Sequence, residues 1–110
     1  MQLLILIIRD SEQMNEILAK MMEQNIRGGS MLECDGALEA LGSSGIAPPV
    51  FSSLREYLNP NQKNKMLLSA MSDENVEKAH KIVNEVTGGL ERENVGVFIT
   101  VPIGVAYGLR

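Results

Sequence analysis

Two spacings of apolar residues predict the elements in the first third of the chain. Residues 3–8 form an unbroken aliphatic run that ends at a charged pair, which is typical of a strand buried on both faces. From about residue 11 to 25 apolar side chains return at helical spacing, behind capping residues. After Gly28 and Gly29, residues 30–34 alternate weakly, as in a short or partly exposed strand.

The same order of elements returns near the end of the chain. Residues 65–71 predict a strand, and Ser72 is a capping residue for a helix that ends at 87–89. Residues 95–101 are rich in β-branched residues, and Pro102, which has no N–H to donate to a sheet, ends that strand. The predicted order is strand, helix, strand, strand, helix, strand.

This order predicts an α+β fold of the ferredoxin-like βαββαβ type. Such a sandwich has an antiparallel four-stranded sheet with two helices on one face. With 110 residues, 45% of them hydrophobic and 22% charged, the chain suits a single globular core, so we expect one domain over 1–110.

The predicted sheet leaves one apolar face without cover. Strands 3–8 and 65–71 carry apolar side chains on both faces, whereas two helices cover only one. Leaving several such side chains in water would forfeit several kcal/mol, at about 25 cal/mol per Å². The tail at 102–110, the insertion before strand 65–71 and other copies of the chain are the candidate covers, and we favour a homo-oligomer.

A long insertion between strands two and three is the second unusual feature. It spans 35–64, whereas a hairpin connection normally needs about two to five residues. We expect flexible chain at 42–45 and a short helix within 48–60, where apolar residues recur at helical spacing between prolines.

Charge and cysteine usage exclude several classes of partner. Ten Lys and Arg against fourteen Asp and Glu give a net charge of −4 without a basic patch, so we expect no nucleic acid. Cys34 has no second cysteine for a disulfide, and with His80 alone it cannot form a standard zinc site. The run 3–8 is too short for a signal peptide or a membrane span, so we expect a cytoplasmic protein without membrane insertion.

The order of elements, the long insertion and four local stretches carry a family resemblance. The stretches are 3–8, 25–30, Gly36 and 97–103. Together they make the chain resemble the PII-type signal-transduction proteins, known first as nitrogen regulatory proteins. The resemblance implies a homotrimer whose sheets pack inward around a threefold axis, with a long loop between strands two and three.

The chain departs from that family where ATP-binding members hold phosphate. Those members use a lysine-bearing glycine loop after the second helix and an arginine pair after the last strand. The corresponding stretches here, 88–94 and 104–109, lack that lysine and that pair, and 9–12 lacks a lysine–proline pattern. Arg92 is left as the main candidate to neutralise phosphate charge, so the chain looks like a divergent, PII-like protein.

By position, the resemblance implies a ligand crevice between subunits. Its lining would be Gly28, Gly29, Ser30, Gly36, Ala37, Gly88, Gly89 and Arg92. Glycine lets a ligand approach backbone N–H groups closely, but the same glycines also suit helix ends and turns. Both interpretations stay open at this point.

Other residues with reactive side chains have ordinary structural explanations. Tyr57 suits a packed helix, and His80 suits a partly exposed helix position. Cys34 has acidic neighbours that disfavour a thiolate, and Asp10 suits a helix cap. We therefore assign no catalytic residue and no metal ligand.

The sequence and the resemblance together predict a non-enzymatic regulator. We expect a homotrimer that binds a small effector at its subunit interfaces, with an adenine nucleotide as the first candidate. Its partner would be a membrane transporter or an enzyme, contacted through the 35–64 loop. The alternative is a CutA-like trimer that binds a divalent metal; a small enzyme has the weakest support because no nucleophile–base pair or phosphate loop stands out.

Overall fold

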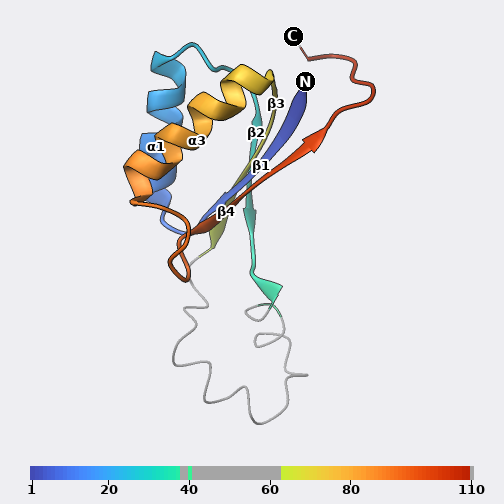
Figure 1. The fold of residues 1–110 in the computed structure, drawn as a ribbon. Coiled ribbons are helices and arrows are strands. Elements are labelled where there is room, and N and C mark those ends of the chain that lie inside the picture. The colour runs from blue at the N-terminus through green and yellow to red at the C-terminus, as the bar shows by residue number, and fades with distance from the viewer. Residues whose placement is uncertain (38–39, 41–62, 110) are drawn as a thin grey trace.

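The predicted order of elements is confirmed in a computed structural model, which describes residues 1–37, 40 and 63–109 (Figure 1). The elements are β1 (Gln2–Ile8), α1 (Ser11–Glu23), β2 (Ser30–Cys34), β3 (Asn64–Met71), α3 (Asp73–Thr87) and β4 (Gly96–Pro102). The predictions of flexible chain at 42–45, of a helix within 48–60 and of a packed Tyr57 lie outside the described residues.

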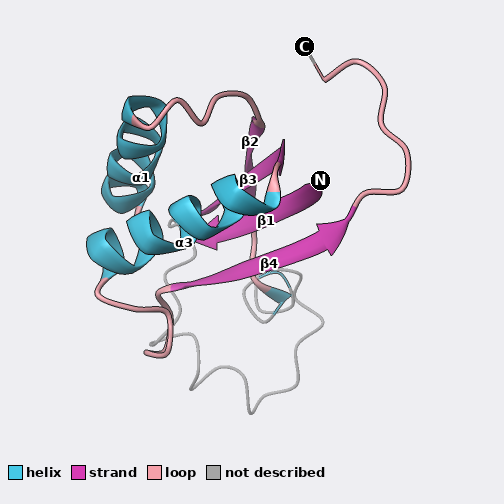
Figure 2. Cartoon of the chain, turned by 45° about the horizontal axis from the view of Figure 1, so that its top comes forward, coloured by secondary structure: helices cyan, strands magenta, loops and turns pink. Residues whose placement is uncertain are grey.

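The strands form one antiparallel sheet in the order β2-β3-β1-β4. Helices α1 and α3 lie side by side on one face of this sheet, and no helix of the described residues covers the other (Figures 1 and 2). The α+β, ferredoxin-like fold with a long insertion between β2 and β3 is therefore confirmed. No helix in the described part of the chain is long and apolar enough to cross a membrane.

The core lies between the helices and the central strands. Leu4, Leu6 and Ile8 alternate along β1 toward the helices and are fully buried. They belong to one cluster with Leu67 and Met71 of β3, Met14, Ile17 and Met21 of α1, Ile26, and Ala79, Ile82 and Val83 of α3. The helical spacing of the apolar residues in α1 and α3 thus turns one stripe of each helix toward the sheet.

Local capping sets where the helices begin and end. The Asp10 carboxylate accepts hydrogen bonds from the backbone N–H groups of Glu12 and Gln13, at 2.9 and 3.0 Å, so Asp10 is the N-cap of α1. The helix ends at Glu23, before the predicted end at residue 25, because Asn25 has a left-handed backbone (φ 62°).

Candidate functional site

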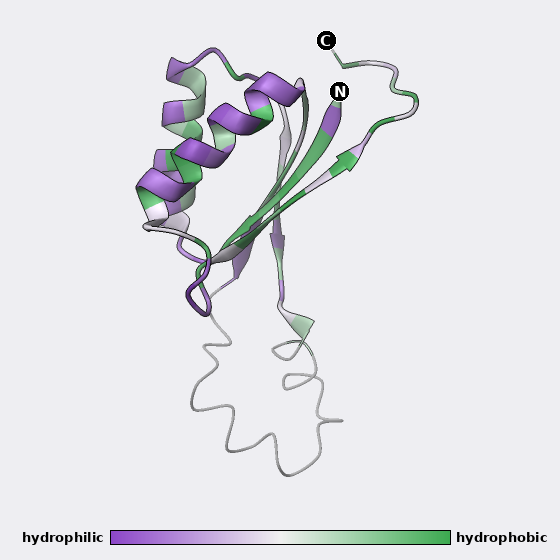
Figure 3. Cartoon of the chain, viewed as in Figure 1, coloured by the Kyte–Doolittle hydropathy of each residue, from purple (hydrophilic) through white to green (hydrophobic). Residues whose placement is uncertain are grey.

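The face of the sheet opposite the helices is apolar, and we call it the open face. Strand register places on it Leu3, Ile5, Ile7, Leu32, Met66, Leu68, Ala70, Val97, Ile99 and Val101. Ile5 sits at its centre, paired with Leu68 on one side and Ile99 on the other. Figure 3 shows the resulting hydrophobic colour along β1 and β4.

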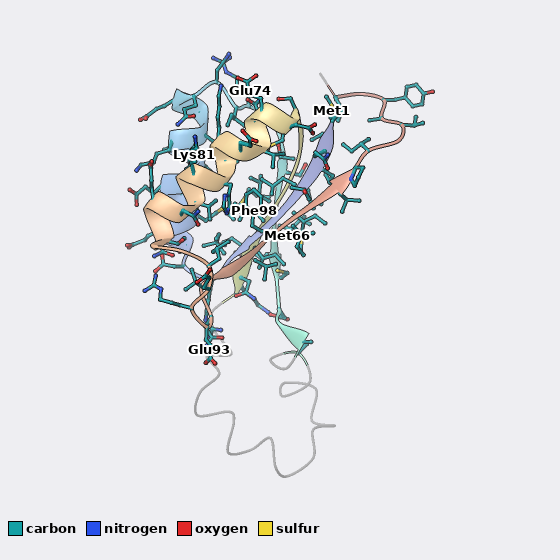
Figure 4. The ribbon with its side chains drawn as sticks, in the orientation of Figure 1. Met1, Met66, Glu74, Lys81, Glu93 and Phe98 are labelled. Carbon is teal, nitrogen blue, oxygen red and sulfur yellow. The ribbon has the colours of Figure 1, made fainter. Side chains whose placement is uncertain are left out.

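The open face contacts solvent in the single chain. Leu32 and the three β4 side chains of this face are between 44 and 48% exposed, although each is strongly apolar. The two faces differ clearly in Figure 4, where Phe98 lies toward the helices and Met66 belongs to the open face. A contiguous apolar surface of this kind marks a binding surface in a folded protein.

A hollow of about 500 Å³ lies at the C-terminal end of α3, and we call it the Arg92 hollow. Its lining residues are His80, Asn84, Gly88, Gly89, Leu90, Glu91 and Arg92. It therefore contains three of the residues predicted for a ligand crevice, Gly88, Gly89 and Arg92.

The end of α3 explains the local shape of this hollow. Gly88 takes a left-handed conformation (φ 79°) and its N–H donates to the Asn84 carbonyl at 2.9 Å. The Arg92 guanidinium folds back and donates to the Thr87 carbonyl. A Cβ on Gly88 would stand 3.2 Å from the Arg92 Nη2, so glycine leaves the space that Arg92 occupies.

In the Arg92 hollow, which Glu91 also lines, the Arg92 guanidinium is the group that suits an anion. A guanidinium has five N–H donors in a planar fork, and the contact with Thr87 leaves others for a carboxylate or a phosphate. His80 lies edge-on to Phe98, with ring centroids 5.2 Å apart, and its Nε2 is 3.4 Å from the Asn84 amide nitrogen. The helix C-terminus disfavours anions, so Arg92 must supply the attraction.

A smaller polar hollow of about 320 Å³ joins Arg92 to the end of β1. It is lined by Arg9, Asp10, Gln13, Arg92, Asn94 and Val95. Next to it, a third hollow of about 240 Å³ contains Arg9 with Ile7, Asn64, Asn94, Gly96 and Val97. Arg9 therefore links the surface around Arg92 to the edge of the open face.

Sequence reasoning did not single out Arg9, Asn64 or Asn94 for this region. The first two lie at ends of strands that meet at one edge of the sheet, since Ile8 pairs with both Lys65 and Gly96. The Arg9 N–H also donates to the Val95 carbonyl at 3.2 Å. This hydrogen bond joins the β1–α1 connection to the α3–β4 connection. The signal that could have found them is the clustering of polar residues at strand ends that share one edge.

Gly28, Gly29 and Ser30 lie elsewhere, beside a hollow of about 520 Å³. The other lining residues are Leu3, Arg27, Leu68, Ala70, Gly108 and Leu109. Gly29 has a packing role here, because a Cβ on it would stand 2.9 Å from the Leu67 Cδ1 and 3.0 Å from the Leu68 carbonyl oxygen. Ser69 also donates to the Gly28 carbonyl, at 3.2 Å.

Gly36 and Ala37 follow β2, at the base of the long insertion. Two ion pairs join the two sides of this base: Lys63 with Asp35, 2.6 Å apart, and Lys65 with Glu33. The hydrogen bond from Lys65, followed by its positive charge, lowers the pKa of the Glu33 carboxyl below its usual value. This base therefore connects β2 and β3 through charged side chains.

The predicted site residues thus fall in three places within one chain. Gly88, Gly89 and Arg92 lie together, and Gly36 and Ala37 lie at the base of the insertion. Gly28 to Ser30 lie at the opposite end of β2 from that base, because Ser30 pairs with Leu68 whereas Cys34 pairs with Asn64. One chain does not unite these groups, and a crevice between subunits stays a prediction. Among the described residues, no group of three or more His, Cys, Asp or Glu side chains could hold a metal ion.

Comparison with known proteins adds no family assignment. No model of a protein family matches this chain, and no curated protein is significantly similar to it. The function is therefore argued from the surfaces described above.

Proposed function

We propose that this chain is a non-enzymatic, PII-like regulatory protein. It acts as a homotrimer, binds a small anionic effector near its subunit interfaces, and signals to a partner protein through the 35–64 segment. The observation that carries the proposal is the open face, an apolar sheet surface that α1 and α3 leave exposed.

The energetics of the open face support self-association. Full burial of one large aliphatic side chain stabilises a protein by about 1.5–3 kcal/mol. Several half-exposed side chains together amount to a large share of the ~5–15 kcal/mol that stabilises a small domain. Packing against the same surface of identical copies buries all of them at once, and closed symmetric assemblies are the common way to do so.

The position of the polar hollows supports an effector site beside the assembly interface. Ile7 and Val97 belong to the open face and also line the hollow that contains Arg9. Arg9 and Arg92 then line the next hollow together. An anionic ligand bound by these guanidinium groups would lie at the margin of the open face, where a second copy would cover it.

The base of the insertion supports a route from the effector to the partner. Asn64 begins β3, pairs with Cys34 of β2 and lines the hollow that contains Arg9. Its side-chain oxygen is buried and has no hydrogen-bond partner among the residues that the structure describes, so a ligand or a water in this hollow has an acceptor to contact. A contact there would reach both ends of the 35–64 insertion.

The effector class and the partner follow from the resemblance to PII proteins. An adenine nucleotide is the first effector to test, and a cytoplasmic enzyme or the cytoplasmic side of a membrane transporter is the expected partner class. A role in nitrogen regulation follows from the same resemblance.

Two measurements test this proposal. Native mass spectrometry should find a species of three times the 12.0 kDa of one chain. Calorimetric titration with ATP, ADP, AMP and cyclic di-AMP should give heat with at least one nucleotide. A compact monomer at working concentration would overturn the assembly, and the absence of heat with all four would overturn nucleotide binding.

Arg92→Ala provides the residue-level test of the effector site. We expect its affinity for the bound nucleotide to fall roughly tenfold or more, because a charge-assisted hydrogen bond contributes about 1.5–3 kcal/mol. Arg92→Lys should recover only part of the affinity, since an ammonium keeps the charge but loses the planar fork. Lys81→Ala, on the exposed side of α3, is the control and should bind normally (Figure 4).

A further inference from the structure

One period-two pattern continues past the end of β4. Bulky apolar residues occupy every second position through the strand and beyond it: Val95, Val97, Ile99, Val101, Ile103, Val105, Tyr107 and Leu109. Such alternation is typical of a strand with one buried face. After Pro102, however, residues 103–109 belong to no strand in the structure.

We call residues 103–109 the C-terminal segment. Its last backbone hydrogen bond to the sheet runs from the Ile103 N–H to the Met1 carbonyl, at 3.2 Å. Beyond it, the Val105 side chain is 74% exposed and the Tyr107 side chain 93% exposed. Figures 1 and 2 show the segment arching away from the sheet. A strand pattern is thus present without a neighbouring strand.

Strand β2 has the complementary feature, an open edge. It is the outermost strand on its side of the sheet, and in the described part of the chain only β3 pairs with it. Natural edge strands are usually protected by proline, by lysine or by unpaired charge. Here Met31 and Leu32 are both exposed, and the charge of Glu33 is paired with Lys65.

We propose that the C-terminal segment of one copy adds as an extra strand to the β2 edge of a second copy of this chain. The inference rests on the self-association proposed above and names the contact that connects neighbouring copies. Val105 and Tyr107 would extend the apolar layer of the open face beside Leu32. The small residues between them, Gly104, Ala106 and Gly108, would occupy the opposite face of the added strand.

The topology explains why a second copy is the occupant. Strands β1 and β3 separate β4 from β2 in the same sheet. The segment first comes near the start of its own β2 at Gly108 and Leu109, which line a hollow together with Ser30. To pair along its own β2 from Ile103 onward the segment would have to cross β1 and β3, whereas a neighbouring copy can bring its segment to β2 without crossing either strand.

This pairing also fits a closed assembly. The segment of one copy and the edge of the next are different surfaces, so the contact runs head to tail, and it gives a ring when the rotation between copies closes. In a cyclic trimer each copy donates one segment and receives one. No β2 edge of that trimer would be left open to aggregation.

Disulfide trapping between two marked chains tests the contact directly. Cys34 is the only cysteine, so Cys34→Ser gives a cysteine-free background. One chain then carries Val105→Cys and a chain of different mass carries Leu32→Cys; the two are mixed, refolded together and oxidised. A second pair, Tyr107→Cys with Leu32→Cys, covers a shift of pairing by two residues.

We expect a cross-linked species with the summed mass of the two chains for at least one of these pairs. Lys81→Cys on α3, paired with Leu32→Cys, is the control and should give none. If neither pair cross-links, the inference is overturned. A double variant of one chain that forms only an internal disulfide overturns it as well, because the segment would then cover its own β2.

Charge substitutions separate this inference from the proposed function. Val105→Asp with Tyr107→Asp should raise the dissociation constant of the assembly roughly tenfold or more. Asn15→Asp on α1 with Gln24→Glu, just after its end, should leave the dissociation constant unchanged. Both pairs alter exposed positions, so circular dichroism should stay the same. An unchanged assembly with the first pair overturns the contact alone; a monomeric wild-type chain overturns the proposed function too.

Discussion

At the scale of single residues, backbone geometry explains several glycines more directly than ligand binding does. Gly29 has a left-handed backbone (φ 125°) and lies against β3, and Gly88 combines a left-handed backbone with the nearby Arg92 guanidinium. Both were predicted from sequence either as ligand contacts or as turn residues. The structure shows that Gly88 ends α3 and that Gly29 packs against β3, and of these two glycines only Gly88 also lines the Arg92 hollow.

Gly29→Ala should destabilise the fold by roughly 1–3 kcal/mol, because the new Cβ would combine backbone strain with a 2.9 Å approach to the Leu67 Cδ1. Gly28→Ala is the matched control. Gly28 has a positive φ but no atom within 4 Å of a Cβ, so only about 1 kcal/mol is expected. Urea denaturation measures both, and equal losses would contradict the packing role of Gly29.

Lys65→Gln should raise the pKa of the Glu33 carboxyl toward its usual value of 4.5, since Lys65 is the main cause of the lowered pKa. The lowered pKa means that the folded chain favours the ionised form. Any stability from this pair is therefore present above pH 4.5 and is lost as the pH falls through the lower, folded-state pKa. Carboxyl NMR titration of both proteins checks this, and an identical Glu33 pKa would contradict it.

At the scale of elements, caps and apolar spacing account for most of the helix boundaries. Asp10 and Ser72 act as N-caps, as their residue types predict, and Gly88 ends α3. The one clear difference between the predicted and the observed helix boundaries is at the end of α1. There the Ile26 N–H donates to the Met21 carbonyl at 2.9 Å, and Ile26 enters the core behind the left-handed Asn25. Spacing alone could not predict this, because the place where Ile26 packs is set by the sheet and by α3, which lie far from it in the sequence.

Asp10→Ala should lower the free energy of unfolding by about 1 kcal/mol, because the Glu12 and Gln13 N–H groups lose their acceptor. Ser11→Ala, at the neighbouring helical position, should change it by less than about 0.5 kcal/mol. Thermal and urea unfolding measure the difference. If the two variants lose the same stability, the cap does not hold the start of α1.

At the scale of the whole molecule, the proposed assembly rests on the open face. Two helices cover one side of the sheet, and the other side combines apolar residues from all four strands. The hollows that contain Arg9 and Arg92 begin at the margin of this face. Assembly, effector binding and contact through the insertion are therefore proposed as parts of one arrangement.

Ile5→Asp tests that arrangement at its centre. A carboxylate between Leu68 and Ile99 cannot be buried without a partner, so we expect monomers or aggregates in place of a defined assembly. Asn15→Asp adds the same charge on the exposed side of α1 and should leave the assembly intact. Size-exclusion chromatography with light scattering measures the mass, and a normal elution of Ile5→Asp would show that this face is not an interface.

The sequence by itself determined the order and type of the elements, the two helix caps and the presence of a second apolar face. These follow from the spacing of apolar residues and from capping chemistry, which act over a few neighbouring residues. Only the tertiary structure decided that β2 and β4 are the outer strands, that Arg9 and Arg92 line one hollow, and that Gly28 to Ser30 lie apart from the Arg92 hollow. Those relations join residues far apart in the chain, and they depend on how the strands pair rather than on local preference.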